Sequence, residues 1–143
     1  MIISAEYIAG FFDGEGSVGI YSRKDRLGGF GLRVQLTQNT STDSQIILQY
    51  LQNKYGGNLT TQKTLSDKLK YNWQLNSNKA VLFLKDIYPY SILKRKQIEV
   101  AIYFQENRPT IKRNSGGEIQ SHNLEDAAWC VEQADKIKRL KHE

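Results

Sequence analysis

The residues with the clearest capacity for chemistry are two carboxylates near the N-terminus, Asp13 and Glu15, within the segment IAGFFDGEG at 8–16. They lie where a helix capped by Ser4 is expected to end. The C-terminal end of a helix carries partial negative charge, so it does not favour carboxylates. A bound cation would stabilise both acids, and we therefore interpret this helix end as a candidate metal site.

Other groups used in catalysis are scarce. The two histidines, His122 and His142, come late in the chain, and the single cysteine, Cys130, excludes a disulfide framework and a cysteine-based zinc site. An enzyme of this composition would depend on carboxylates, lysines and bound cations. The sequence shows neither an apolar run of membrane-spanning length nor a secretory signal. Together with the lone cysteine, this predicts an intracellular protein without a membrane partner.

Two glycines share one face of the expected first helix. Gly10 and Gly14 stand four residues apart, and glycine inside a helix is costly unless it serves a purpose. Small residues at this spacing allow another helix to approach closely. The spacing predicts a helix contact here, with packing against the protein's own sheet as the alternative.

Positive charge is concentrated in two segments of a 143-residue chain whose formal net charge is +5. Residues 17–38 hold four basic side chains against one acid, and residues 57–79 do the same, so each carries +3 and the remainder −1. Such clustering is typical of a surface that binds a polyanion. A solvated basic surface without a ligand is the alternative.

The same two segments show the pattern of strands. Apolar and polar residues alternate at 32–37, 70–76 and 18–23 and less clearly at 59–64, which predicts two antiparallel hairpins with one solvent-exposed (wet) face. Helices are expected at 4–13, at 42–55 with a capping box at Thr42 and Gln45, at 78–88, at 91–105 and from 123 onward. This order predicts one α+β domain over 1–143, with helices on the dry side of the sheet.

The wet face of the expected sheet carries side chains suited to nucleic acids. Arginine, glutamine and asparagine match base edges, whereas lysine and threonine suit phosphates. The predicted contact residues on the strands are Tyr21, Arg23, Arg33, Gln35, Thr37, Thr60, Gln62, Lys70, Asn72 and Gln74, and those of the hairpin loops and ends are Lys24, Arg26, Lys63 and Lys68. For the last helix we predict a buried stripe of Leu124, Ala127, Ala128 and Val131.

The segment 8–16 resembles the LAGLIDADG motif of homing endonucleases, with Ile8 for the first leucine, two phenylalanines in the middle and Gly-Glu-Gly at the end. A dinucleotide-binding fingerprint over 14–19 is excluded, because that motif follows a strand and opens a helix, the reverse of the order here. The order helix, hairpin, helix, hairpin, helices also resembles that family's core, over about residues 4–106. Residues 107–143 resemble its variable C-terminal helical region.

The resemblance implies a set of site residues. Glu15 would be the metal-binding acid, with the backbone carbonyl of Gly14 as a further ligand. Gln38 would order water, and Lys94 would polarise the scissile region, with Lys96 as its competitor. The implied cofactor is Mg²⁺ or another divalent cation such as Mn²⁺, with no small-molecule cofactor.

One motif per chain implies a homodimer that joins through Ala9, Gly10, Asp13 and Gly14. The expected activity is double-strand cleavage of a long, near-palindromic DNA site by an intron-encoded enzyme, in an organelle, bacterial or phage host that the sequence does not identify. The alternatives are a non-cleaving nucleic-acid-binding protein, either an intron-splicing maturase or a transcription regulator, and a basic scaffold protein. Glu15 favours cleavage, because a pure binder has no use for that acid.

Overall fold

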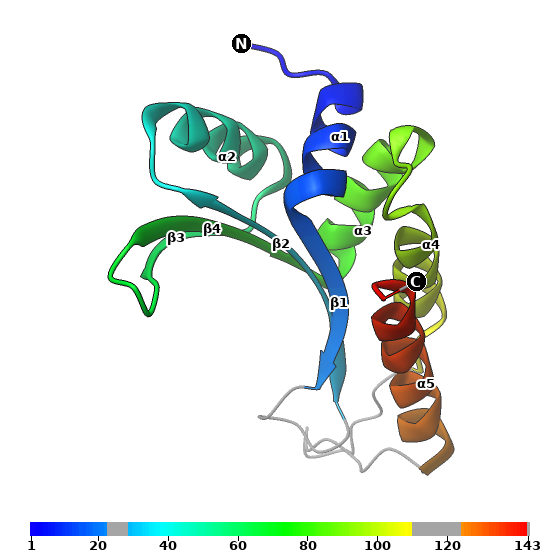
Figure 1. Ribbon diagram of the computed structural model, residues 1–143. Helices are drawn as coiled ribbons and strands as arrows, with labels where there is room; N and C mark the ends of the chain where they lie inside the picture. The colour runs from blue at the N-terminus through cyan, green and yellow to red at the C-terminus, as the bar shows by residue number, and fades with distance from the viewer. Residues whose placement is uncertain (23–28, 110–123, 143) are drawn as a thin grey trace, which may run out of the picture.

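The computed structural model describes residues 1–22, 29–109 and 124–142. In this part of the chain, helices cover one face of a curved four-stranded sheet and leave the other face open (Figure 1). The elements in chain order are α1 (Ala5–Glu15), β1 (Gly16–Ser22), β2 (Phe30–Asn39), α2 (Thr42–Tyr55), β3 (Asn58–Lys63), β4 (Leu69–Asn76), α3 (Ser77–Ile87), the 3₁₀ turn η1 (Tyr88–Tyr90), α4 (Arg95–Asn107) and α5 (Leu124–Leu140). The α+β class and the order of elements are confirmed.

The two hairpins join through their second strands. The strand order is β1-β2-β4-β3, and all neighbouring strands are antiparallel. Gln35 lies opposite Ser17 on one side and Gln74 on the other, and Gln74 lies opposite Asn58. Because side chains alternate between the faces of a strand, rows of residues cross the whole sheet on the same face.

The dry face of the sheet forms the core with the helices. Val18, Val34, Leu36 and Leu75 are fully buried there, as the alternation predicted. Phe83 of α3 packs edge-on against Trp73 of β4 with 5.2 Å between ring centroids, and against Phe12 of α1 at 5.3 Å. Burial of such a ring stabilises the fold by about 2–3 kcal/mol.

One helix cap and one helix start differ from those expected. Ser4 caps α1 as predicted, since its Oγ accepts a hydrogen bond from the Tyr7 N–H. The cap of α2 is Ser41, whose Oγ accepts from the Ser44 N–H at 3.1 Å, so the capping box expected at Thr42 is wrong by one residue. α4 begins at Arg95 rather than residue 91, because the backbone N–H groups just before it bind a side chain of α1, as described below.

α5 runs antiparallel to α4 and also packs against β1 (Figure 1). Its buried residues are Cys130, Gln133, Ala134 and Ile137. The predicted stripe was wrong at Ala128 and Val131, which are exposed, whereas Ala127 is half-buried. The Leu124 side chain lies outside the described part of the structure. None of the helices in the described parts of the chain is long and apolar enough to cross a membrane.

Candidate functional site

The candidate site lies where α1 passes into β1. Glu15 is the last residue of α1, and its side chain is exposed. The Gly16 N–H makes the last helical bond, to the Phe12 carbonyl, and the helix ends because the backbone becomes extended at Gly16. A Cβ atom at Gly16 would overlap the Phe12 ring, so the close packing of this turn requires glycine. The motif therefore delivers one carboxylate to the edge of the sheet.

Asp13 has a different role from the one expected. Its buried carboxylate accepts hydrogen bonds from the Ser91 hydroxyl and from the N–H groups of Ile92 (2.7 Å), Leu93 (3.0 Å) and Lys94 (3.2 Å). Donors at the start of a helix lack partners within that helix and favour negative charge. Asp13 thus holds the start of α4, and the expectation that this acid needs a cation is wrong.

The hydrogen bonds also determine the protonation of Asp13. Burial by itself raises the pKa of the carboxyl, but the bonds from Ser91 and the three N–H groups favour the charged form and together lower the pKa below its usual value. Asp13 is therefore a structural carboxylate at neutral pH.

The exposed face of α1 is narrower than expected. Ala9 is fully buried in the core and Asp13 is turned toward α4, so these two residues offer no side-chain surface to a second copy. Gly10 and Gly14 are exposed, and no atom lies within 4 Å of a Cβ built on either glycine. This excludes packing of the two glycines against the protein's own sheet. The open face of α1 consists of Tyr7, Gly10 and Gly14, one turn apart.

The three residues predicted to be catalytic come from three separate elements and meet at this helix end. Gln38, near the end of β2, donates from Nε2 to Glu15 Oε2 at 3.3 Å and to the Thr37 carbonyl at 3.0 Å. Lys94, just before α4, donates from Nζ to the Asp13 carbonyl at 2.6 Å. The acceptor, Asp13, comes directly before Gly14 and Glu15 in the sequence, so this bond holds the ammonium at the end of α1.

The environment of Lys94 makes its proton easier to release. Burial is the largest cause and lowers the pKa of the ammonium, and the positive charge of Lys141 at the end of α5 lowers it further. The carboxylates of Asp13 and Glu15 act in the opposite direction without cancelling these effects. The competitor Lys96 is exposed and lines a groove between α4 and α5 with Glu99 and Lys136. The geometry therefore favours Lys94 as the lysine of the site.

The donor atoms at this helix end fit half of a site for a hard divalent cation. Such cations take several oxygen ligands. One copy offers the exposed Glu15 carboxylate and the Gly14 carbonyl of the last helical turn, where carbonyls lack partners within the helix. No group of three or more His, Cys, Asp or Glu side chains that could hold a metal occurs within residues 1–22, 29–109 and 124–142.

The open face of the sheet carries most of the predicted contact residues. By strand register the following share this face: Tyr21, Arg33, Gln35, Thr37, Thr60, Gln62, Lys70, Asn72 and Gln74. Asn72 is only 6% exposed and accepts a hydrogen bond from the Thr37 hydroxyl, so it is not accessible as predicted. Lys63 pairs with Leu69, which puts it on the other face from Gln62. Arg23, Lys24 and Arg26 lie outside the described residues.

Contacts between neighbouring side chains order this face. Gln35 Nε2 donates to Gln74 Oε1 at 3.2 Å, and the Arg33 guanidinium lies over the Tyr21 ring, 4.9 Å from its centroid. Four further polar residues share the face: Ser17, Asn39, Asn58 and Asn76. The alternation over 70–76 already includes Asn76, and carrying it one or two residues beyond the other three segments would have found the rest. Lys68 lies in the turn between β3 and β4 and is exposed.

The sheet has an open polar face, and next to it the end of α1 brings together a carboxylate, an amide and an ammonium. A match to a family model shows which class of protein has this arrangement. The family model described as LAGLIDADG endonuclease matches residues 8–107. The chain therefore belongs to the LAGLIDADG endonuclease family. No curated protein matches it in sequence.

Solved structures share the fold. The homing endonuclease I-CvuI in complex with its target superposes with a TM-score of 0.69 at 22% identity, over 95% of this chain and 80% of that one. I-CvuI with the I-CreI target gives 0.66 at 25% identity over the same shares. The archaeal intron-encoded I-Vdi141I in complex with DNA gives 0.64 at 19% identity, over 95% and 82%.

Replacing Asp13 with asparagine is expected to lower the free energy of unfolding by about 2 kcal/mol, because charged hydrogen bonds to the start of α4 are lost. The folded-state pKa of Asp13 is lowered, so its contribution is complete above the unfolded pKa of about 3.9 and is lost as pH falls through the folded pKa. Urea denaturation at pH 7 and below pH 4 should therefore show a gap between wild type and variant that narrows in acid. The exposed Asp135→Asn is the control, and an equal effect in both variants would contradict the assignment.

Proposed function

We propose that this protein is a site-specific DNA endonuclease that cuts both strands as a homodimer with a divalent cation. The observation that carries the proposal is the exposed Glu15 at the end of α1, hydrogen-bonded to Gln38 and within the electrostatic reach of Lys94. Membership of the LAGLIDADG endonuclease family supports the same reaction. As an enzyme acting on DNA it would work inside the cell.

Glu15 and the Gly14 carbonyl are the residues that would hold Mg²⁺ or Mn²⁺. When bound, such a cation activates water and stabilises charge on a phosphoryl oxygen. The Gln38 amide orients the Glu15 carboxylate through its 3.3 Å hydrogen bond. The Lys94 ammonium is held at the end of α1 by its bond to the Asp13 carbonyl. Its lowered pKa suits an ammonium that donates a proton or a hydrogen bond to a leaving oxygen.

Two copies are needed because one copy supplies a single Glu15, whereas a DNA duplex has two strands to cut. The open face of α1, with Gly10 and Gly14 and free space above them, allows a second α1 to approach closely. An isologous contact of the two helices would bring two Glu15 side chains near a common two-fold axis. The target of such a dimer would be near-palindromic, since the DNA reflects the symmetry of the protein.

The open face of the sheet is the proposed DNA-binding surface. I-CvuI and I-Vdi141I were solved in complex with DNA, and a strand ribbon fits the major groove. Arg33, Gln35 and Gln74 would contact base edges, while Lys70 and Thr37 would contact phosphates.

A non-cleaving nucleic-acid-binding protein is the second candidate. One structure of I-CvuI, with the I-CreI target and 2 mM Mg, is described as revealing DNA that is not cleaved, so binding by this fold does not by itself entail cutting. Retention of Glu15 with its hydrogen bond to Gln38 favours the enzyme.

Cleavage is expected to disappear in the variant Glu15→Gln while DNA binding stays within about twofold, because the variant removes a metal ligand and not a DNA contact. The target would first be selected from a DNA library by binding in Ca²⁺, and cleavage would then be measured in Mg²⁺. Glu6→Gln, an exposed acid at the other end of α1, is the matched control. Selective binding by the wild type with intact DNA in Mg²⁺ and Mn²⁺ would support the maturase or regulator instead.

Gly10→Leu is expected to prevent dimerisation, because the new side chain fills the space needed by the second helix. The same space is open within one copy, so the fold should persist by circular dichroism. Sedimentation of the free protein measures the oligomeric state. A Gly10→Leu dimer of wild-type mass would refute the role of this helix face.

Lys70→Gln is expected to reduce the salt dependence of DNA binding. Each lost phosphate contact lowers the slope of log K against log salt by about 0.9, so the loss from both copies of a dimer is about two units. Fluorescence anisotropy from 50 to 300 mM KCl on the selected target would measure it. Lys85→Gln, on α3 away from the sheet face, should leave the slope unchanged, and an unchanged slope for Lys70→Gln would remove this lysine from the phosphate contacts.

A further inference from the structure

The Arg33 side chain has no acidic partner in the described parts of the chain. It lies on the inner strand β2, between Gly19 of β1 and Asn76 of β4. Neither of the ion pairs found in those parts includes Arg33, and its buried Nε atom has no hydrogen-bond partner there. The guanidinium therefore keeps its full positive charge on the open face of the sheet.

The Tyr21 ring holds this guanidinium in position. Arg33 Cζ lies 4.9 Å from the ring centroid, and the ring covers Gly19, the residue opposite Arg33. A Cβ atom at Gly19 would be 2.7 Å from the Tyr21 hydroxyl oxygen and 2.8 Å from two ring carbons, so the ring occupies the space that a side chain would take. Gly19, Tyr21 and Arg33 thus form one packed unit.

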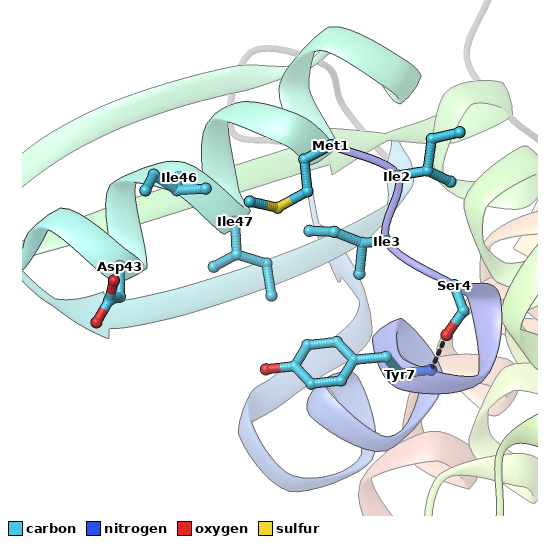
Figure 2. Close-up of a pocket in the computed structure, with 8 residues that line it drawn as sticks. All are labelled: Met1, Ile2, Ile3, Ser4, Tyr7, Asp43, Ile46 and Ile47. Carbon is cyan, nitrogen blue, oxygen red and sulfur yellow. Dashed lines mark hydrogen bonds between the residues drawn. The ribbon is translucent and has the colours of Figure 1, made fainter.

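Two other tyrosines show what is particular to this unit. Tyr88 also has an arginine over its ring, Arg95 at 4.3 Å, but Arg95 donates to the Tyr88 carbonyl and lies 4.0 Å from Glu99. Tyr7 borders a groove beside the N-terminal segment and α2 in which none of the described lining residues is basic (Figure 2). Arg33 combines a ring beneath it with donors that the described part of its chain does not pair with an acid.

The geometry of a stacked guanidinium selects its ligand. Contact with a ring uses the flat face of the guanidinium and leaves the N–H groups at its edge free to donate. Two such donors in one plane match two acceptors that lie side by side. In the major groove, guanine presents this pair as O6 and N7, whereas adenine presents an acceptor and a donor, thymine an acceptor and a methyl group, and cytosine a donor.

The neighbours of Arg33 favour a base over a phosphate. Gln74 and Asn76 share its face, and Gln74 Nε2 donates to Asn76 Oδ1 at 3.4 Å, while Gln35 Nε2 donates to Gln74 Oε1 at 3.2 Å. These side chains are neutral amides, which suit base edges. Because β2 is an inner strand, Arg33 would face the middle of the groove of a duplex on the sheet, where the base edges lie.

We propose that Arg33, held in place by Tyr21 over Gly19, recognises a guanine in each half-site of the DNA target. Arg33 contacts the base, and Tyr21 is a positioning residue that acts through Arg33. This inference rests on the proposed function and names one base pair of its substrate. In a two-fold symmetric dimer the guanine occurs once in each half-site, on opposite strands and at the same distance from the centre.

Binding by the wild type and Arg33→Ala tests the base contact. The wild type selects its target from a DNA library in Ca²⁺, and the base pairs of that target are then changed one at a time and followed by fluorescence anisotropy. The wild type should prefer guanine at one position of each half-site at least about fivefold, and Arg33→Ala should lose this preference. Replacing that guanine with 7-deazaguanine, which lacks N7, should weaken wild-type binding at least about threefold and leave Arg33→Ala unaffected.

Variants beneath the guanidinium test the positioning role. Tyr21→Phe keeps the ring and should keep the preference for guanine within about twofold, whereas Tyr21→Ala should reduce it at least about threefold. Gly19→Ala should also reduce it, because the new methyl group displaces the ring without removing a group that contacts DNA. The ring ends a flexible side chain, so the fold should persist by circular dichroism. Ser22→Ala, exposed on β1 and on the other face of the sheet, is the matched control.

Four outcomes would contradict the inference. Arg33 is a phosphate contact if Arg33→Ala weakens binding to every sequence equally and lowers its salt dependence. The positioning role is overturned if Tyr21→Phe loses the preference as fully as Tyr21→Ala. A wild type that selects no DNA sequence overturns this inference and the proposed function together. A wild type that selects and cleaves a target, with base preferences that survive Arg33→Ala, overturns the guanine contact alone.

Discussion

The arrangement of the site depends on the bonds between the Asp13 carboxylate and the start of α4. Ser91 and three successive N–H groups converge on one acid, which fixes the end of α1 against a segment some eighty residues later. The same contact positions Lys94 beside the Glu15 end of the helix and holds Ile92 and Leu93 on the surface. One buried carboxylate therefore determines how the proposed catalytic residues Glu15 and Lys94 lie relative to each other.

The sheet was the part most readily predicted from the sequence. Period-two alternation in 32–37 and 70–76 fixed the face of each side chain, and the observed register places the predicted residues in shared rows. Glu15, Gln38 and Lys94 came from resemblance to a family motif, and the structure brings Gln38 to the Glu15 carboxylate. Local pattern and motif together thus identified both the wet face and the residues that gather at the helix end.

Long-range contacts explain what the sequence could not reveal. Asp13 resembled a second metal ligand because its actual partners lie far along the chain, and Ala9 resembled an interface residue because its burial depends on the sheet beneath it. The stripe of α5 was misassigned because the buried residues described on this helix are mostly small or polar: Cys130, Gln133 and Ala134 accompany Ile137. Asn72 follows the alternation and lies on the predicted face. It is nevertheless not accessible, because Thr37 and Thr60 lie on either side of it on the neighbouring strands.

The side-chain bonds across the strands have a consequence for engineering. Gln35 is bonded to Gln74, and Thr37 to Asn72, so a replacement on one strand frees or reorients a group on the next. Effects of neighbouring substitutions in such a network do not add. If this surface binds DNA as proposed, altered recognition would have to be sought by varying these cross-strand partners together, since a change at only one of the four positions breaks a pair.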